Sequence, residues 1–83
     1  MSTPREEELL RRITINPAVL GGKPIIRGMR LSVQQIVEAI AAGVPEPDLL
    51  ADFPYLEPDD IRAALLYAAK RVANEDVWPV LVA

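Results

Sequence analysis

The sequence predicts a small α+β fold that is mainly helical, with a short β-ribbon near its start and a three-helix bundle after it. Segment 12–32 combines β-branched residues with glycine and proline, which is typical of short strands joined by tight turns. Three later segments, 33–42, 46–53 and 58–73, carry helix-start signals or helical apolar spacing. At 83 residues the chain has room for one hydrophobic core and therefore for one domain.

Residues 1–11 precede the ribbon and predict a short helix. Thr3 and Glu6 have the spacing of a capping box, in which each side chain accepts a hydrogen bond from the other residue's backbone. The apolar residues of this segment are confined to Leu9 and Leu10. We therefore expect the helix to be only weakly anchored to the domain.

The ribbon itself is predicted to contain three short strands. The stretch "RITI" at 12–15 alternates polar and apolar residues, as a half-buried strand does. Gly21 and Gly22 then permit backbone angles that other residues avoid. Short strands at about 25–27 and 30–32 are expected to form a hairpin around the intervening glycine.

The first helix of the bundle is predicted at 33–42. Ser32 and Gln35 form a second capping box at its start, and Gly43 is a typical residue just beyond a helix end. Its apolar residues fall on one helical stripe, namely Val33, Ile36, Val37 and Ile40.

Two further helices complete the bundle, at 46–53 and 58–73. Prolines bound the shorter one, and Pro58 occupies the first position of the longer one. The longer helix has two apolar stripes. The main one, expected to seat the helix on the domain, is Ile61, Leu65, Ala68 and Val72. The second, expected to leave surface for a partner, is Leu66, Ala69 and Ala73.

The spacing of these last two helices is that of a helix-turn-helix, but their charge disfavours reading of DNA by the second helix. In that motif the start of the second helix meets the bases in the major groove. Here this start carries Glu57, Asp59 and Asp60. Because affinity for DNA comes largely from neutralising phosphates, we expect these acids to cap the helix and not to face nucleic acid.

Charge is distributed unevenly along the chain. Residues 1–30 carry six cations and three acids, whereas residues 31–83 carry three cations and nine acids. The basic half predicts a nucleic-acid-binding edge formed by Lys23, Arg27, Arg30, Arg11 and Arg12. The alternative is that Arg27 and Arg30 pair with the acidic half of the chain and hold the hairpin on the helices.

The composition disfavours an enzyme and a metalloprotein. The chain contains neither cysteine nor histidine, which removes the commonest metal ligands and the commonest general base. Acids at 48, 52, 59 and 60 are better explained as a solvated, helix-capping face than as a magnesium site. We expect no catalytic residues, no metal and no cofactor.

Hydrophobic residues make up 51% of the chain, more than a core of this size hides. A homodimer or a complex with another protein is therefore expected. No apolar run is long enough to span a membrane, and the expected location is the cytoplasm.

The tail, 74–83, is an apolar arm that contains four candidate partner contacts: Val77, Trp78, Val80 and Leu81. Tryptophan is enriched in interface hot spots, and Pro79 favours an extended arm over a continued helix. The arm either folds back on its own domain, exchanges within a homodimer, or binds a different protein. The residues leave these alternatives open.

Two stretches resemble a known family. "NPAVLGGKPIIRGMRLSVQQIVEAIAAG" and "LLADFPYLEPDDIRAALLYAA" are similar to the small bacterial domain-of-unknown-function family 433, over about residues 12–73. The chain departs from the family pattern at Met29, where threonine is usual, and at Pro45, where a serine or threonine cap is usual.

The resemblance implies a homeodomain-like or helix-turn-helix-like domain that acts as an antitoxin beside a PIN-like ribonuclease. We therefore expect an antitoxin-like binding module that occludes the ribonuclease with its tail and with Leu66 and Ala69, and that represses its own operon through the basic ribbon. The alternative is a stand-alone transcriptional regulator of the helix-turn-helix type, with no toxin partner.

Overall fold

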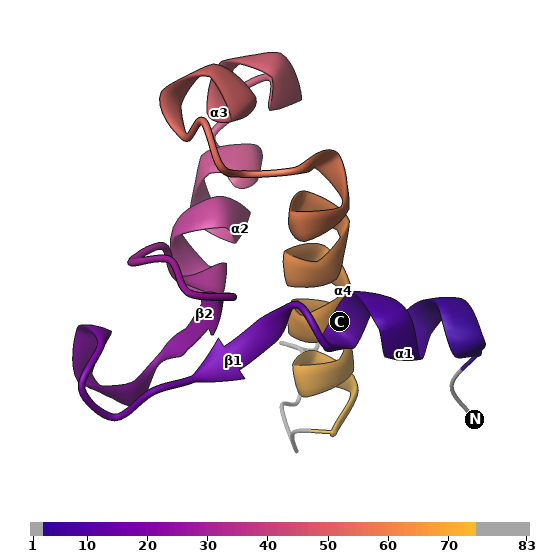
Figure 1. Ribbon diagram of the computed structural model, residues 1–83. Helices are drawn as coiled ribbons and strands as arrows, with labels where there is room; N and C mark the ends of the chain where they lie inside the picture. Colours follow the sequence, from indigo (N-terminus) through magenta and orange to yellow (C-terminus); the bar gives the residue numbers. More distant parts are fainter. Residues whose placement is uncertain (1–2, 75–83) are drawn as a thin grey trace, which may run out of the picture.

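The computed structural model describes residues 3–74 of the chain. The elements follow one another in the order α1 (Pro4–Leu10), β1 (Ile13–Ile15), a short 3-10 turn η1 (Leu20–Gly22), β2 (Pro24–Ile26), α2 (Val33–Ala41), α3 (Glu46–Asp52) and α4 (Pro58–Asn74). Helices α2 and α4 lie side by side, with α3 at one end of the pair and the ribbon at the other (Figure 1). The fold is therefore a mainly helical α+β domain, as the sequence predicts.

The three helices of the bundle begin where the sequence places them and end within one residue of the predicted positions. Helix α2 begins after the predicted capping box, since Gln35 N donates to Ser32 Oγ at 3.0 Å and Ser32 N donates to Gln35 Oε1 at 2.9 Å. Its C-terminus closes with a Schellman motif around Gly43, whose φ of 88° suits glycine. None of the helices within residues 3–74 is both long and apolar enough to cross a membrane.

The ribbon is a two-stranded antiparallel sheet, in which Ile13 lies opposite Ile26 and Ile15 opposite Pro24. The predicted third strand at 30–32 is wrong. That segment makes a single bridge, between Ile25 and Ser32, and one ladder hydrogen bond, from Ile26 N to Leu31 O at 2.9 Å. Pairing stops there because α2 begins at Val33, directly after the bridged Ser32.

The core is formed where β2, α2, α3 and α4 meet. Its buried members are Ile26, Leu31, Val33, Ile36, Leu49, Leu56, Ile61 and Ala64. Helix α1 packs on α4 outside this cluster and contributes the buried Leu9. It is held more firmly than the sequence indicates, because Arg5 reaches Asp59 at 2.8 Å and Lys70 reaches Glu6 at 3.6 Å.

The predicted seating stripe of α4 is partly wrong. Leu65 is 39% exposed and Val72 is 66% exposed, whereas Ala63 and Ala64 are fully buried. The reason is that α4 packs against α1 as well as α2, so its buried face is set by two neighbours. Small alanine side chains on that face let the helices approach closely.

Candidate functional site

Asp60 is the centre of an ion-pair network at the start of α4. Its side chain is fully buried, at 0% exposure. One carboxylate oxygen accepts from Arg12 at 3.1 Å, and the other accepts from Arg27 at 3.1 Å and from the backbone N–H of Glu57 at 2.8 Å. The same residue therefore caps its own helix and holds two arginines that lie next to each other at the open end of the ribbon, one before β1 and one after β2.

Two more acids, the exposed Glu57 and the half-buried Asp59, extend this network. Glu57 accepts from Arg12 at 2.6 Å and from Arg27 at 3.0 Å, and Asp59 accepts from Arg5 at 2.8 Å. The hydrogen bond from Arg12, and next the charge of Arg27, lower the pKa of Glu57 below its ordinary value of 4.5. The hydrogen bond from Arg5 lowers the pKa of Asp59 below 3.8. Hydrogen bonds to Glu57 and then Asp60 raise the pKa of Arg12.

The five cations predicted to bind nucleic acid differ in their contacts within the chain. Arg12 and Arg27 are brought together, but their guanidinium groups are engaged by the acids of α4. The sequence left open whether Arg27 pairs with acids of the chain. It does so here, and Arg12 pairs with the same acids. Lys23 lies at the start of β2 and donates to Gln34 at 3.2 Å. Arg30 and Arg11 are exposed and make no ion pair with any residue between 3 and 74.

The predicted partner contacts lie partly outside the described chain. Leu66 is half-buried on α4 and Ala69 is exposed. The remaining candidates, Val77, Trp78, Val80 and Leu81, lie outside the described residues. So does most of the predicted arm at 74–83. Leu65 and Val72 are also exposed and lie one turn before and after Ala69 on α4. This face of α4 is therefore apolar and open to solvent.

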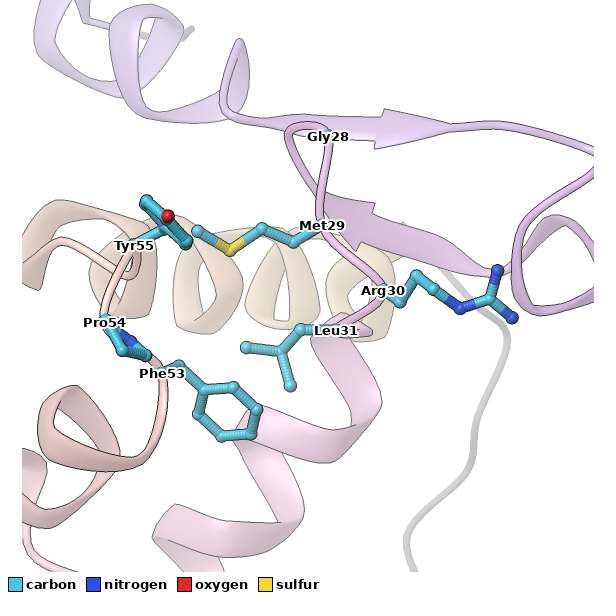
Figure 2. A pocket seen from close by; sticks show the side chains of 7 residues that line it. All are labelled: Gly28, Met29, Arg30, Leu31, Phe53, Pro54 and Tyr55. Atoms are coloured by element: carbon cyan, nitrogen blue, oxygen red, sulfur yellow. The ribbon is translucent and has the colours of Figure 1, made fainter.

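An aromatic pocket that the sequence did not predict lies between the turn that joins β2 to α2 and the loop from α3 to α4. It has a volume of about 380 Å³ and is lined by Gly28, Met29, Arg30, Leu31, Phe53, Pro54 and Tyr55. In Figure 2 the Met29 side chain extends towards the Tyr55 ring, Phe53 lies across from Leu31, and Arg30 points away from the other side chains. Tyr55 is 82% exposed, so most of its ring is available to a partner.

The signal that could have found this pocket is the sequence "FPY" at 53–55. Two aromatic residues flank a proline between two predicted helices, in a loop that the core cannot fully cover. Aromatic residues, methionine and arginine are the types enriched at protein–protein interfaces. Within the described residues, no group of three or more histidine, cysteine, aspartate or glutamate residues is arranged to hold a metal ion.

These features define a small, mainly helical α+β domain whose surface combines an internally paired ion network with an exposed aromatic pocket. The chain belongs to the family described as "Protein of unknown function (DUF433)", whose model matches residues 13–68. This confirms the family resemblance seen in the sequence.

A solved structure and a curated protein are also similar to this chain. The crystal structure of a DUF433 member protein from Anabaena variabilis has a TM-score of 0.72 and 34% identity, covering 81% of this chain and 66% of that one. "Uncharacterized protein y4eO" of Sinorhizobium fredii is 38% identical over 56 residues, which is 68% of this chain. The match spans only 25% of y4eO and less than two thirds of the Anabaena chain.

Proposed function

We propose that this protein is an antitoxin-like binding module that inhibits a partner by occlusion and carries out no chemistry of its own. The observation that supports this proposal is the exposed aromatic pocket, with Tyr55 at its rim and Met29 and Phe53 in its wall. Tyrosine and arginine anchors account for much of the binding energy in protein interfaces. Arg30, beside the pocket, supplies a cation that no acid within residues 3–74 neutralises.

The proposed partner class is a PIN-like ribonuclease, which rests on the family resemblance of the sequence. An acidic metal-binding groove of such an enzyme would present carboxylates to Arg30 and apolar surface to the pocket. The exposed α4 face with Ala69 is a second contact surface of the same proposal. The pocket is lined by residues of two loops, 27–32 and 53–57, and the second surface lies on α4.

The test is affinity capture from the native cell, followed by reconstitution. The tagged full chain should retain a small nuclease, identified by mass spectrometry, and the purified pair should show stoichiometric loss of RNA cleavage. Tyr55→Ala should weaken binding by about tenfold or more, since truncating an interface hot spot costs about 2 kcal/mol. Ala69→Arg tests the α4 face in the same assay.

Ile15→Ala is the matched control, because Ile15 is an exposed apolar residue on β1 that does not line the pocket. It should bind as the unaltered chain does. Capture of no nuclease, or a nuclease whose inhibition is unaffected by both Tyr55→Ala and Ala69→Arg, would contradict the proposal.

A stand-alone regulator that binds operator DNA is the second candidate, and one observation favours it. Lys23, Arg30 and Arg11 make no ion pair within the described residues and remain available to phosphates. Arg30→Ala should then weaken DNA binding and lower the slope of log affinity against log salt by about one. Binding that does not weaken as salt rises would eliminate this candidate.

A further inference from the structure

A second hollow lies between α2 and the C-terminal half of α4. Its volume is about 620 Å³, larger than that of the aromatic pocket. Apolar side chains form its walls, with Val33 and Val37 one helical turn apart on α2, and Tyr67 and Ala68 on α4. Its charged lining residues are Lys23, Glu38 and Arg71. We call this hollow the α2–α4 groove.

The groove lies close to the point where the chain leaves α4. Arg71 is three residues before Asn74, the last residue of the helix, and nine residues follow. Residues 77–82 of that continuation are Val, Trp, Pro, Val, Leu and Val, with no charge among them. Six extended residues span at most about 20 Å, whereas the helix advances only about 9 Å from Ala68 to Asn74. The continuation is therefore long enough to run back along the groove.

Charge and connectivity both favour this segment as the occupant. Glu75 and Asp76, which join it to α4, are opposite in sign to Lys23 and Arg71, the two cations that outnumber the one acid, Glu38, in the lining. A link of only two residues gives an effective concentration of about 1 mM or more, which a second copy of the chain reaches only in concentrated solution. Covering Trp78 would remove about 200 Å² of largely apolar surface from water.

We propose that residues 77–82 occupy the α2–α4 groove of the same chain, with Trp78 against its apolar walls. The inference does not depend on the proposed function. It has a consequence for that function, however, because a partner that takes up the tail must compete with the groove. Residues 77–82 would then stay bound in the α2–α4 groove until a partner displaces them.

Trp78 is the only tryptophan of the chain, so its fluorescence reports on this segment alone. The full chain should show blue-shifted emission and slow acrylamide quenching, both unchanged over about a hundredfold dilution. Val37→Asp places a carboxylate on the apolar wall that α2 contributes, and it should shift the emission to that of solvent-exposed tryptophan. Ala68→Glu, on the wall that α4 contributes, should do the same, so that the result does not depend on one variant.

Leu65→Asp is the matched control, because it introduces the same charge on the exposed face of α4, away from the groove. It should leave the emission unchanged, and far-UV circular dichroism establishes that each variant is folded. Solvent-like emission in the unaltered chain would overturn the proposal. The same would follow if folded groove variants left the emission unchanged, or if Leu65→Asp shifted it equally. Emission that turns solvent-like on dilution would assign the groove to a second copy instead.

Discussion

Asp60 is the residue on which most of the local order at the start of α4 depends. A buried carboxylate is tolerated only when its oxygens are satisfied, and here they accept from two guanidinium groups and one backbone N–H. Arg12 and Arg27 precede Asp60 by 48 and 33 residues, so the contact closes the ribbon onto the long helix. The residue is therefore a structural centre of the domain and not a group presented to a ligand.

Replacing Asp60 with alanine should lower the free energy of unfolding by about 3 kcal/mol. The change leaves two arginines without their buried partner and removes the side-chain cap of α4. Urea denaturation measures the loss as a shift in midpoint at unchanged slope. Asp52→Ala is the control, since Asp52 is exposed at the end of α3, and it should change stability by less than about 0.5 kcal/mol. Equal effects of the two substitutions would contradict this account of Asp60.

The ion-pair partners of Arg12 and Arg27 could not be predicted from the sequence around each residue. From the sequence, both Arg12 and Arg27 were predicted to bind nucleic acid, and pairing with the acidic half of the chain was left open for Arg27 but not for Arg12. Their partners lie between 30 and 48 residues away. Whether two charges so far apart in sequence meet is decided by the packing of the ribbon on α4.

At the scale of the element, the ends of α2 follow from local sequence. The Ser32–Gln35 capping box and the Gly43 Schellman motif each involve residues within five positions of one another. Such short-range signals act before any tertiary contact forms, which is why the start and the end of this helix were predictable. The third strand predicted at 30–32 did not form, because α2 begins at Val33, directly after the one residue that bridges to β2.

Ser32→Ala should destabilise the domain by about 1 kcal/mol, because Gln35 N loses its acceptor at a buried helix start. Thr3→Ala removes the equivalent bond from α1 and should cost less, because α1 contributes only Leu9 to the buried residues. Urea midpoints of both variants provide the comparison. A larger loss for Thr3→Ala would show that α1 is more important to the fold than its burial indicates.

At the scale of the whole molecule, acidic side chains link α1, the ribbon and the start of α4, so stability should depend on pH. The folded-state pKa is lowered for Glu57 by Arg12 and for Asp59 by Arg5. It is lowered for Glu6 chiefly by the backbone hydrogen bond from Thr3. A carboxyl group with a lowered folded-state pKa stabilises the folded chain above its unfolded pKa, and this contribution is lost as pH falls through the folded value.

We therefore expect the urea midpoint to be constant from about pH 7 down to about pH 5 and to fall as pH is lowered further. Glu57→Gln should reduce the steepness of that fall, because it removes one of the titrating groups. Glu46→Gln is the matched control, at an acid with no ion pair among the described residues. A midpoint that does not change between about pH 5 and about pH 3 would contradict the expectation.

The family, the mainly helical α+β class and the bounds of the bundle helices to within a residue could be predicted from short-range signals in the sequence. These signals are motifs and caps that operate over a few residues. The buried face of α4, the convergence of Arg12 and Arg27 on Asp60, and the pocket shared by Met29 and Tyr55 became known from the packed fold. The physical reason is that burial and ion pairing depend on which elements become neighbours. Neighbours such as α1 and α4 are separated by most of the length of the chain.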